Sequence, residues 1–188
     1  MVIGGTIMKK YSLILIIVSI FMLIFVSGCA NSKLKKYTKY INNSMDSVSN
    51  IALLVEVKDK NVLVYKYVRN IKFDGANANI ETIESTLSSS FILEDKVSND
   101  FISDIDRDKI NSINLSKNLL ESFEVKSDVL KATINKDNIS KVLGSNSLEI
   151  LENAELTITF NKKQISKLEC IFKTESGKDV VLNIEYNY

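Results

Sequence analysis

Hydrophobic and polar residues alternate strictly in the last third of the chain. Three segments, 154–160, 168–172 and 180–188, carry an apolar residue at every second position. Period-2 alternation predicts β-strands with one buried face and one solvated face. Polar turn residues separate the segments, at Asn161–Lys163 and at Ser176–Gly177. The pattern predicts an antiparallel meander of well-specified register, because a slip by one residue would expose every apolar side chain.

Three further strands are predicted upstream of this meander. Ile51–Val57 alternates between apolar and polar residues, and after a polar turn Val62–Phe73 reads as its partner in a hairpin. Val129–Ile134 predicts another strand. A short helix over Asn138–Leu143 follows it, with Asp137 placed as the residue that caps its N-terminus.

Helical spacing occurs in three segments, 32–48, 80–91 and 97–105, where apolar residues recur every three or four positions. The first of these segments predicts either a helix that packs on the sheet or a helix that lies on a membrane surface. We expect an α+β fold, in which an antiparallel β-sheet (C-terminal meander plus N-terminal hairpin) is covered on one face by helices.

The N-terminus has the pattern of an export signal. Lys9 and Lys10 precede the apolar run Tyr11–Val26, which is short for a membrane span and typical of a secretory signal. Small residues and Gly28 then lead to Cys29, a sequence that resembles the lipobox of bacterial lipoproteins. This resemblance implies cleavage between Gly28 and Cys29 and attachment of lipid to the Cys29 sulfur. Two or three acyl chains anchor a protein stably in a membrane.

These features predict the division of the chain. Residues 1–28 form the signal peptide, 29–33 a lipidated tether and 34–188 a single domain. Residues 1–7 can be back-translated into a ribosome-binding sequence and spacer, so we hypothesise that translation starts at Met8. Removal of the two lysines of the signal turns the formal charge of +1 into −1 for the mature chain.

Composition narrows the chemistry that this domain can perform. The chain lacks His, which is the commonest general base and metal ligand in proteins. Its two Cys residues are too few for a zinc site of the Cys/His type. A net charge near zero argues against a nucleic-acid partner. We therefore expect no enzyme activity, no cofactor and no metal.

Two groups of acidic residues are candidates for a metal site or a catalytic site. Asp104, Asp106 and Asp108 open like a calcium loop, but Lys109 and Leu115 occupy the positions that need Gly and Glu. A solvated polar segment is the simpler interpretation. The pairs Glu81/Glu84 and Glu149/Glu152 would share a helical face if their segments are helical, but such spacings are common by chance.

One thiol and a set of tyrosines complete the candidates. Cys170 lies at an inward position of its predicted strand, and we expect it to be a small core residue and not a nucleophile. Four tyrosines are predicted mainly to pack in the core and at its rim, with a recognition patch at one end of the sheet as the alternative: Tyr65, Tyr67, Tyr186 and Tyr188.

The C-terminal pattern over Lys131–Tyr188 resembles the second half of the LolA/LppX type of lipoprotein carrier. The resemblance consists of a strand, the turn sequence INKDN, a short helix and a meander that ends in VLNIEYNY. It implies a half-barrel sheet with a hydrophobic cavity. The residues that would line this cavity are Phe160, Phe172, Leu182 and Ile184.

From the sequence we expect a lipoprotein anchored in the cell membrane through Cys29, on the extracytoplasmic face. Its domain is expected to be a non-catalytic binding or interaction domain for an envelope protein. The alternative is a carrier of lipid or of another hydrophobic ligand.

Overall fold

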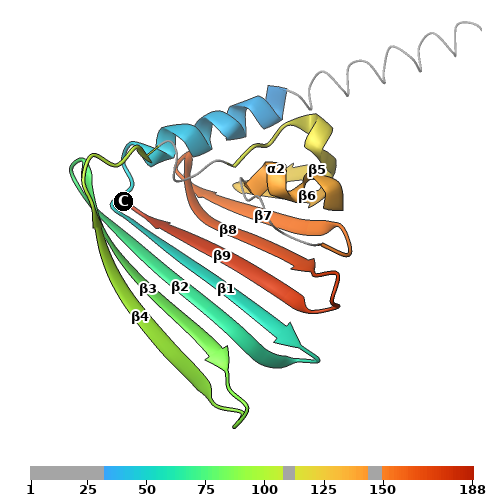
Figure 1. Ribbon diagram of the computed structural model, residues 1–188. Helices are drawn as coiled ribbons and strands as arrows, with labels where there is room; N and C mark the ends of the chain where they lie inside the picture. The colour runs from blue at the N-terminus through green and yellow to red at the C-terminus, as the bar shows by residue number, and fades with distance from the viewer. Residues whose placement is uncertain (1–31, 108–112, 144–149) are drawn as a thin grey trace, which may run out of the picture. The chain divides into compact units, whose positions relative to one another are not determined.

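The computed structural model describes residues 32–107, 113–143 and 150–188, and the lipobox at Cys29 lies outside these residues. Residues 1–37 and 38–188 form two separate compact units. The second unit holds nine strands that form one antiparallel sheet (Figure 1): β1 (Asn50–Asp59), β2 (Val62–Asp74), β3 (Asn77–Leu87), β4 (Leu93–Ile102), β5 (Leu120–Lys126), β6 (Val129–Ile134), β7 (Ala154–Asn161), β8 (Gln164–Lys173) and β9 (Asp179–Asn187).

The predicted meander and N-terminal hairpin are both present. β7, β8 and β9 pair in sequence, and β1 pairs with β2. Lys60 and Asn61 in the β1–β2 turn, and Lys162 and Lys163 in the β7–β8 turn, have positive φ. Two consecutive residues with positive φ are typical of the type I′ turns that join antiparallel strands tightly.

The sheet is assembled from two halves that are distant in the sequence. Its strand order is β4-β3-β2-β1-β9-β8-β7-β6-β5, so the first strand and the last strand are neighbours at its centre. Their register places Leu53 opposite Ile184 and Val55 opposite Leu182. Figure 1 shows the C-terminus beside the start of β1.

Alternation within the strands separates an inner face from an outer face. The inner face is the one that carries Leu53, Leu156 and Cys170. Over β6, β7 and β8 its apolar residues are fully buried, including Leu130, Ile158 and Leu168. The outer positions of β7 carry Glu155, Thr157 and Thr159, which are exposed or half-buried. The core of the domain therefore lies on the inner face of the C-terminal half of the sheet.

Helical residues 38–45 contact this half of the sheet. The rings of Tyr40 and Phe160 meet edge to face, with centroids 6.2 Å apart. The buried Ser44 hydroxyl accepts a hydrogen bond from the Ile165 amide at 3.0 Å and donates one to the Tyr40 carbonyl at 2.6 Å. A β-bulge lies next to this position, where the register of the β7–β8 pair shifts after Thr159.

The expectation of an α+β fold with helices covering one face is wrong. The segments 80–91 and 97–105, expected to be helical, lie largely in β3 and β4, and the domain is mainly β-sheet. β3 contains several β-branched residues, which favour extended backbone, and its pairing with β2 and β4 satisfies its backbone polar groups. Residues 32–45 are helical, as expected.

The short helix after β6 is present as α2 (Ile139–Leu143), preceded by a 3₁₀ turn. The prediction that Asp137 caps it is wrong. Asn135 performs this role, because its side-chain oxygen accepts a hydrogen bond from the Asp137 amide at 3.1 Å. No helix within the described ranges is long and apolar enough to cross a membrane.

Arg107 holds three segments together at one end of the sheet. Its Nη1 donates to the carbonyls of Val48 and Asp46 at 3.0 and 3.2 Å, just after the helical residues 38–45. Nη2 donates to the Gly75 carbonyl in the β2–β3 turn at 3.0 Å. The guanidinium carbon lies 4.4 Å from the ring centroid of Phe73. These contacts attach the segment after β4 to the sheet and to the end of the helix.

We expect Arg107→Ala to lower the free energy of unfolding by about 2 kcal/mol, because hydrogen bonds from a charged donor contribute this much and the carbonyls lose their partner. Urea denaturation followed by circular dichroism measures the change. Lys72→Ala, at an exposed position of β2, is the control and should have little effect. Equal stability of both variants would contradict this role for Arg107.

Candidate functional site

A pocket of about 490 Å³ lies on the inner face of the N-terminal half of the sheet. Its floor comes from β1, β2, β3 and β9, and the end of β4 with the segment that follows it forms a wall. Three polar residues line it, Arg69, Asp104 and Asp106. The other lining residues are apolar: Ile51, Leu53, Ile71, Ile80, Ile102, Ile105, Ile184 and Tyr186. Volume and lining are in the range typical of small-molecule sites.

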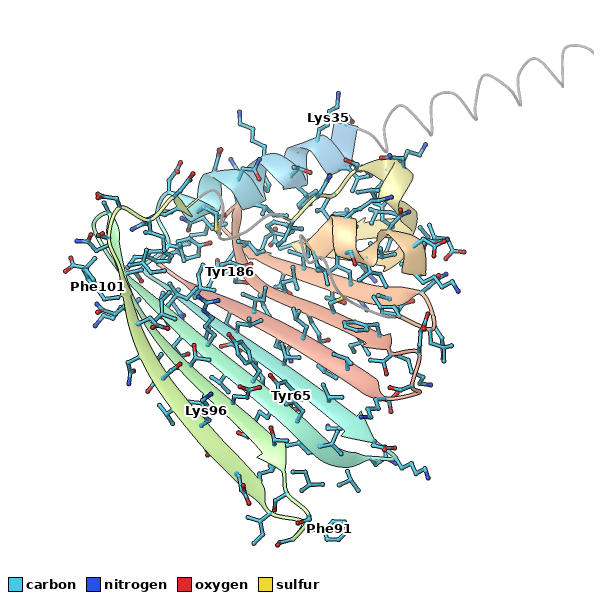
Figure 2. All side chains as sticks on the ribbon, viewed as in Figure 1. Lys35, Tyr65, Phe91, Lys96, Phe101 and Tyr186 are labelled. Carbon is cyan, nitrogen blue, oxygen red and sulfur yellow. The ribbon has the colours of Figure 1, made fainter. Side chains whose placement is uncertain are left out.

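The wall segment is positioned by backbone bonds as well as by Arg107. The Ile105 amide donates to the Ala76 carbonyl in the β2–β3 turn at 2.8 Å. Asp104 adopts a positive φ of 51°, which turns the chain at the end of β4. Figure 2 shows Tyr186 and Phe101 toward this end of the sheet. The pocket is therefore built by residues that the fold holds in place.

The apolar floor continues beyond the pocket along the same face. Val55 and Leu182 form the next cross-strand pair after Leu53 and Ile184, and all four side chains are half-buried. The strands β7 and β8, by contrast, bury their inner residues almost completely. Figure 2 shows Tyr65 on this continuation, well away from Tyr186. The inner face of the N-terminal half thus remains accessible where that of the C-terminal half is covered.

The hydroxyl of Tyr65 is a polar group at the far end of this apolar stretch of the inner face. It donates a hydrogen bond to the Glu84 carboxylate at 3.0 Å, between β2 and β3. Burial, and then this hydrogen bond and the charge of Glu84, raise the pKa of Tyr65 to about 12. The hydroxyl is therefore protonated at any physiological pH, and the pair presents a fixed dipole rather than a proton donor for catalysis.

Arg69 is the charged residue on the floor of the pocket. It lies opposite Leu53 on β1 and Thr82 on β3, between the inward residues Tyr67 and Ile71. Its Nε is buried and has no hydrogen-bond partner. Sequence reasoning missed this residue. The signal was a single cation at an inward position of a strand whose other inward residues are apolar or aromatic.

The structure brings one of the four predicted lining residues into this pocket. Ile184 lines it, and Leu182 lies on the adjoining floor. Phe160 and Phe172 are buried. Phe160 packs on Tyr40, and Phe172 lies opposite Val180. The four residues as one lining set stay a prediction.

The other candidates are placed as follows. Asp104 and Asp106 line the pocket, whereas Asp108 and Lys109 lie outside the described residues. In the part of the chain that the structure describes, no group of acidic residues or Cys could hold a metal ion. Glu81 and Glu84 lie three positions apart on the strand β3, so their side chains face opposite sides of the sheet. The helical face that they were expected to share is not formed. Glu149 is not described.

The four tyrosines do not form one cluster. Tyr65 lies opposite Val57 of β1, and Tyr186 lies opposite Ile51 of the same strand. Val57 and Ile51 are six residues apart. This separation is about 20 Å along the strand. The Tyr188 hydroxyl donates to the Ile165 carbonyl at 2.6 Å.

Cys170 is confirmed as a core residue. It is fully buried on the inner face of β8, opposite Leu156 and Leu182, and its thiol is free. Burial, and next the charge of Glu155, raise the pKa of the thiol to about 12. Because the thiolate is the reactive form, the thiol is unreactive at neutral pH.

We expect Cys170 in the folded domain to resist iodoacetamide at pH 8 and to react fully in guanidinium chloride. Alkylation of a chain of residues 32–188, in which Cys170 is the only cysteine, is followed by mass spectrometry. A rate in the native protein equal to that of a free thiol peptide would show that the site is open.

No protein-family model and no curated protein matches this chain. Among solved structures, it matches a redesigned β-barrel bound to DFHBI at 11% identity and a TM-score of 0.24, over 76% of this chain and 97% of that chain. It also matches a de novo designed fluorescence-activating β-barrel at 11% identity and a TM-score of 0.23, over 78% and 99% of the two chains. Scores this low establish neither a common fold nor a function.

Proposed function

We propose that this protein is an extracytoplasmic lipoprotein whose domain binds a hydrophobic ligand on the inner face of its sheet. The pocket of about 490 Å³ is the observation that carries the proposal. Its apolar residues come from five strands and one connecting segment. A partly open apolar concavity of this size is favourable for a ligand because binding removes its surface from water.

The anchor is a separate part of this proposal. The lipobox resemblance at Gly28 and Cys29 supports attachment to the outer face of the cell membrane. A domain that binds lipid-like molecules next to a membrane would find its ligand at high local concentration. The proposal includes no catalytic step, in keeping with the absence of His from the sequence.

A protein-interaction domain is the second candidate. Every residue of the edge strand β4 is exposed, and Val97 and Phe101 are 57% and 64% exposed. At the β3–β4 turn, Phe91 is 83% exposed and points away from the sheet (Figure 2). Exposed apolar residues on an edge strand are typical of a surface that pairs with another chain. Absence of ligand uptake by the pocket would favour this candidate.

Ligand uptake is testable with N-phenyl-1-naphthylamine, an uncharged apolar dye whose fluorescence rises when it leaves water. A chain of residues 32–188 is suitable, because residues 38–188 form a compact unit and every described element is included. We expect saturable binding by the wild type and about tenfold weaker binding by Ile184→Gln, because the polar amide disrupts the apolar floor.

Ile171→Gln is the matched control. Ile171 is 44% exposed on the opposite face of the sheet, so the same substitution there should leave dye affinity unchanged. Circular dichroism confirms that each variant is folded. Folded wild type that does not raise the fluorescence of the dye would refute the binding proposal.

The anchor is tested in the full chain by Cys29→Ser, expressed in a bacterium that processes lipoproteins. We expect the variant to stay unprocessed or to leave the membrane fraction, because the lipid cannot be attached. Fractionation and mass spectrometry measure both properties. Membrane retention of the variant at the mature size would overturn the lipobox assignment.

A further inference from the structure

The floor of the pocket contains a cation, Arg69, whose buried Nε has no hydrogen-bond partner in the part of the chain that the structure describes. Arg69 is half-buried among apolar residues, with Leu53 opposite and Ile71 beside it on the same face. In the described ranges, no hydrogen bond or ion pair from its side chain is present. Burying part of a guanidinium without a partner is unfavourable, and such groups in native proteins call for an explanation.

Arg107 shows what a structural arginine looks like in the same domain. Its guanidinium donates to backbone carbonyls of two segments and stacks on Phe73. Removal of Arg107 would leave those carbonyls without a donor. Removal of Arg69 would leave no acceptor unpaired among the residues that the structure describes, so its guanidinium is available to a group that enters the pocket.

Two carboxylates share the pocket, but they occupy a different part of it. Asp104 and Asp106 come from the wall segment and are exposed to solvent, whereas Arg69 comes from the floor and is half-buried. Water screens exposed charges strongly and buried charges weakly. The half-buried charge on the floor of the pocket is therefore that of Arg69. Glu84, the half-buried carboxylate further along the same face, does not line the pocket and accepts the hydrogen bond of the Tyr65 hydroxyl.

We propose that Arg69 binds the acidic head group of a single-chain amphiphile, a carboxylate or a phosphate monoester, whose alkyl chain lies along the apolar floor. This inference rests on the proposed ligand-binding function and names the class of ligand. A guanidinium pairs with either head group through two parallel hydrogen bonds. From the Leu53–Ile184 pair the floor continues through Val55 and Leu182 to Val57 and Val180, about 13 Å along the strands.

The experiment compares three probes with the same alkyl chain, dodecanoate, dodecyl phosphate and dodecanol, as competitors of N-phenyl-1-naphthylamine on the chain of residues 32–188. At least one acidic probe should displace the dye from the wild type at a concentration about tenfold or more below the dodecanol concentration that does so. The reason is that charged hydrogen bonds to a buried cation are strong. The better acidic probe tells whether a fatty acid or a phosphate-bearing lipid is the favoured source.

Three variants separate the head-group role from a structural one. Arg69→Gln should lose the preference for the acidic probes. The preference is measured within each variant, as the ratio of the dodecanol and acidic-probe concentrations that displace half of the dye, so it does not depend on the variant's own affinity for the dye. Arg69→Lys keeps the charge and should retain part of the preference. Asp104→Asn removes a nearby negative charge and should keep or increase it.

The outcomes separate the two proposals. Folded wild type that binds no dye refutes ligand binding in the pocket altogether. Dye binding with equal displacement by dodecanol and by both acidic probes refutes only the role of Arg69. A preference that persists in Arg69→Gln also refutes it, and a lower melting temperature of that variant with unchanged preference assigns Arg69 to packing.

Discussion

The pairing of β1 with β9 is the contact on which the rest of this domain depends. It joins the strands β1 to β4 to the strands β5 to β9, and without it the chain would contain two separate sheets. The pair is central, so its backbone hydrogen bonds are flanked by strands on both sides. It also brings Leu53 beside Ile184 and Val55 beside Leu182, residues from opposite ends of the sequence. The floor of the candidate site exists only because this pair forms.

The two halves of the sheet differ in how their inner faces are covered. The C-terminal half buries Leu156, Leu168 and Cys170 completely, and helical residues 38–45 contact it through Tyr40 and Ser44. Over the N-terminal half, the described residues 103–107 after β4 cover one end. Arg107 and the Ile105 amide hold this segment, and the pocket lies between it and the strands. Incomplete cover over a continuous apolar face is thus the structural origin of the site.

The strands β7 to β9 could be predicted from the sequence because their periodicity reports burial on one face. β3 could not, because its inward residues include Thr82 and Glu84 beside Ile80, so alternation is weak and Ile80, Ile83 and Leu87 mimic a helical face. β4 is exposed on both faces and leaves no burial pattern at all. β3 becomes a strand by pairing with β2, and β4 by pairing with β3, contacts between segments that the local sequence does not reveal. The α+β prediction was wrong for this reason.

The sequence by itself determined the features that depend on neighbouring residues: the meander, the hairpin turns, the buried thiol at Cys170 and the lipobox pattern, which remains a sequence prediction. The tertiary structure decided which apolar faces meet. It placed Ile184 in the pocket and Phe160 and Phe172 in buried positions, although all three alternate in the same way along their strands. It also set Arg69 on the floor of the pocket, with its buried Nε lacking a hydrogen-bond partner among the described residues. Alternation of apolar and polar residues indicates that one face of a strand is apolar. Which segment covers that face depends on contacts between residues that are distant in the sequence, and the space left for a ligand depends on the same contacts.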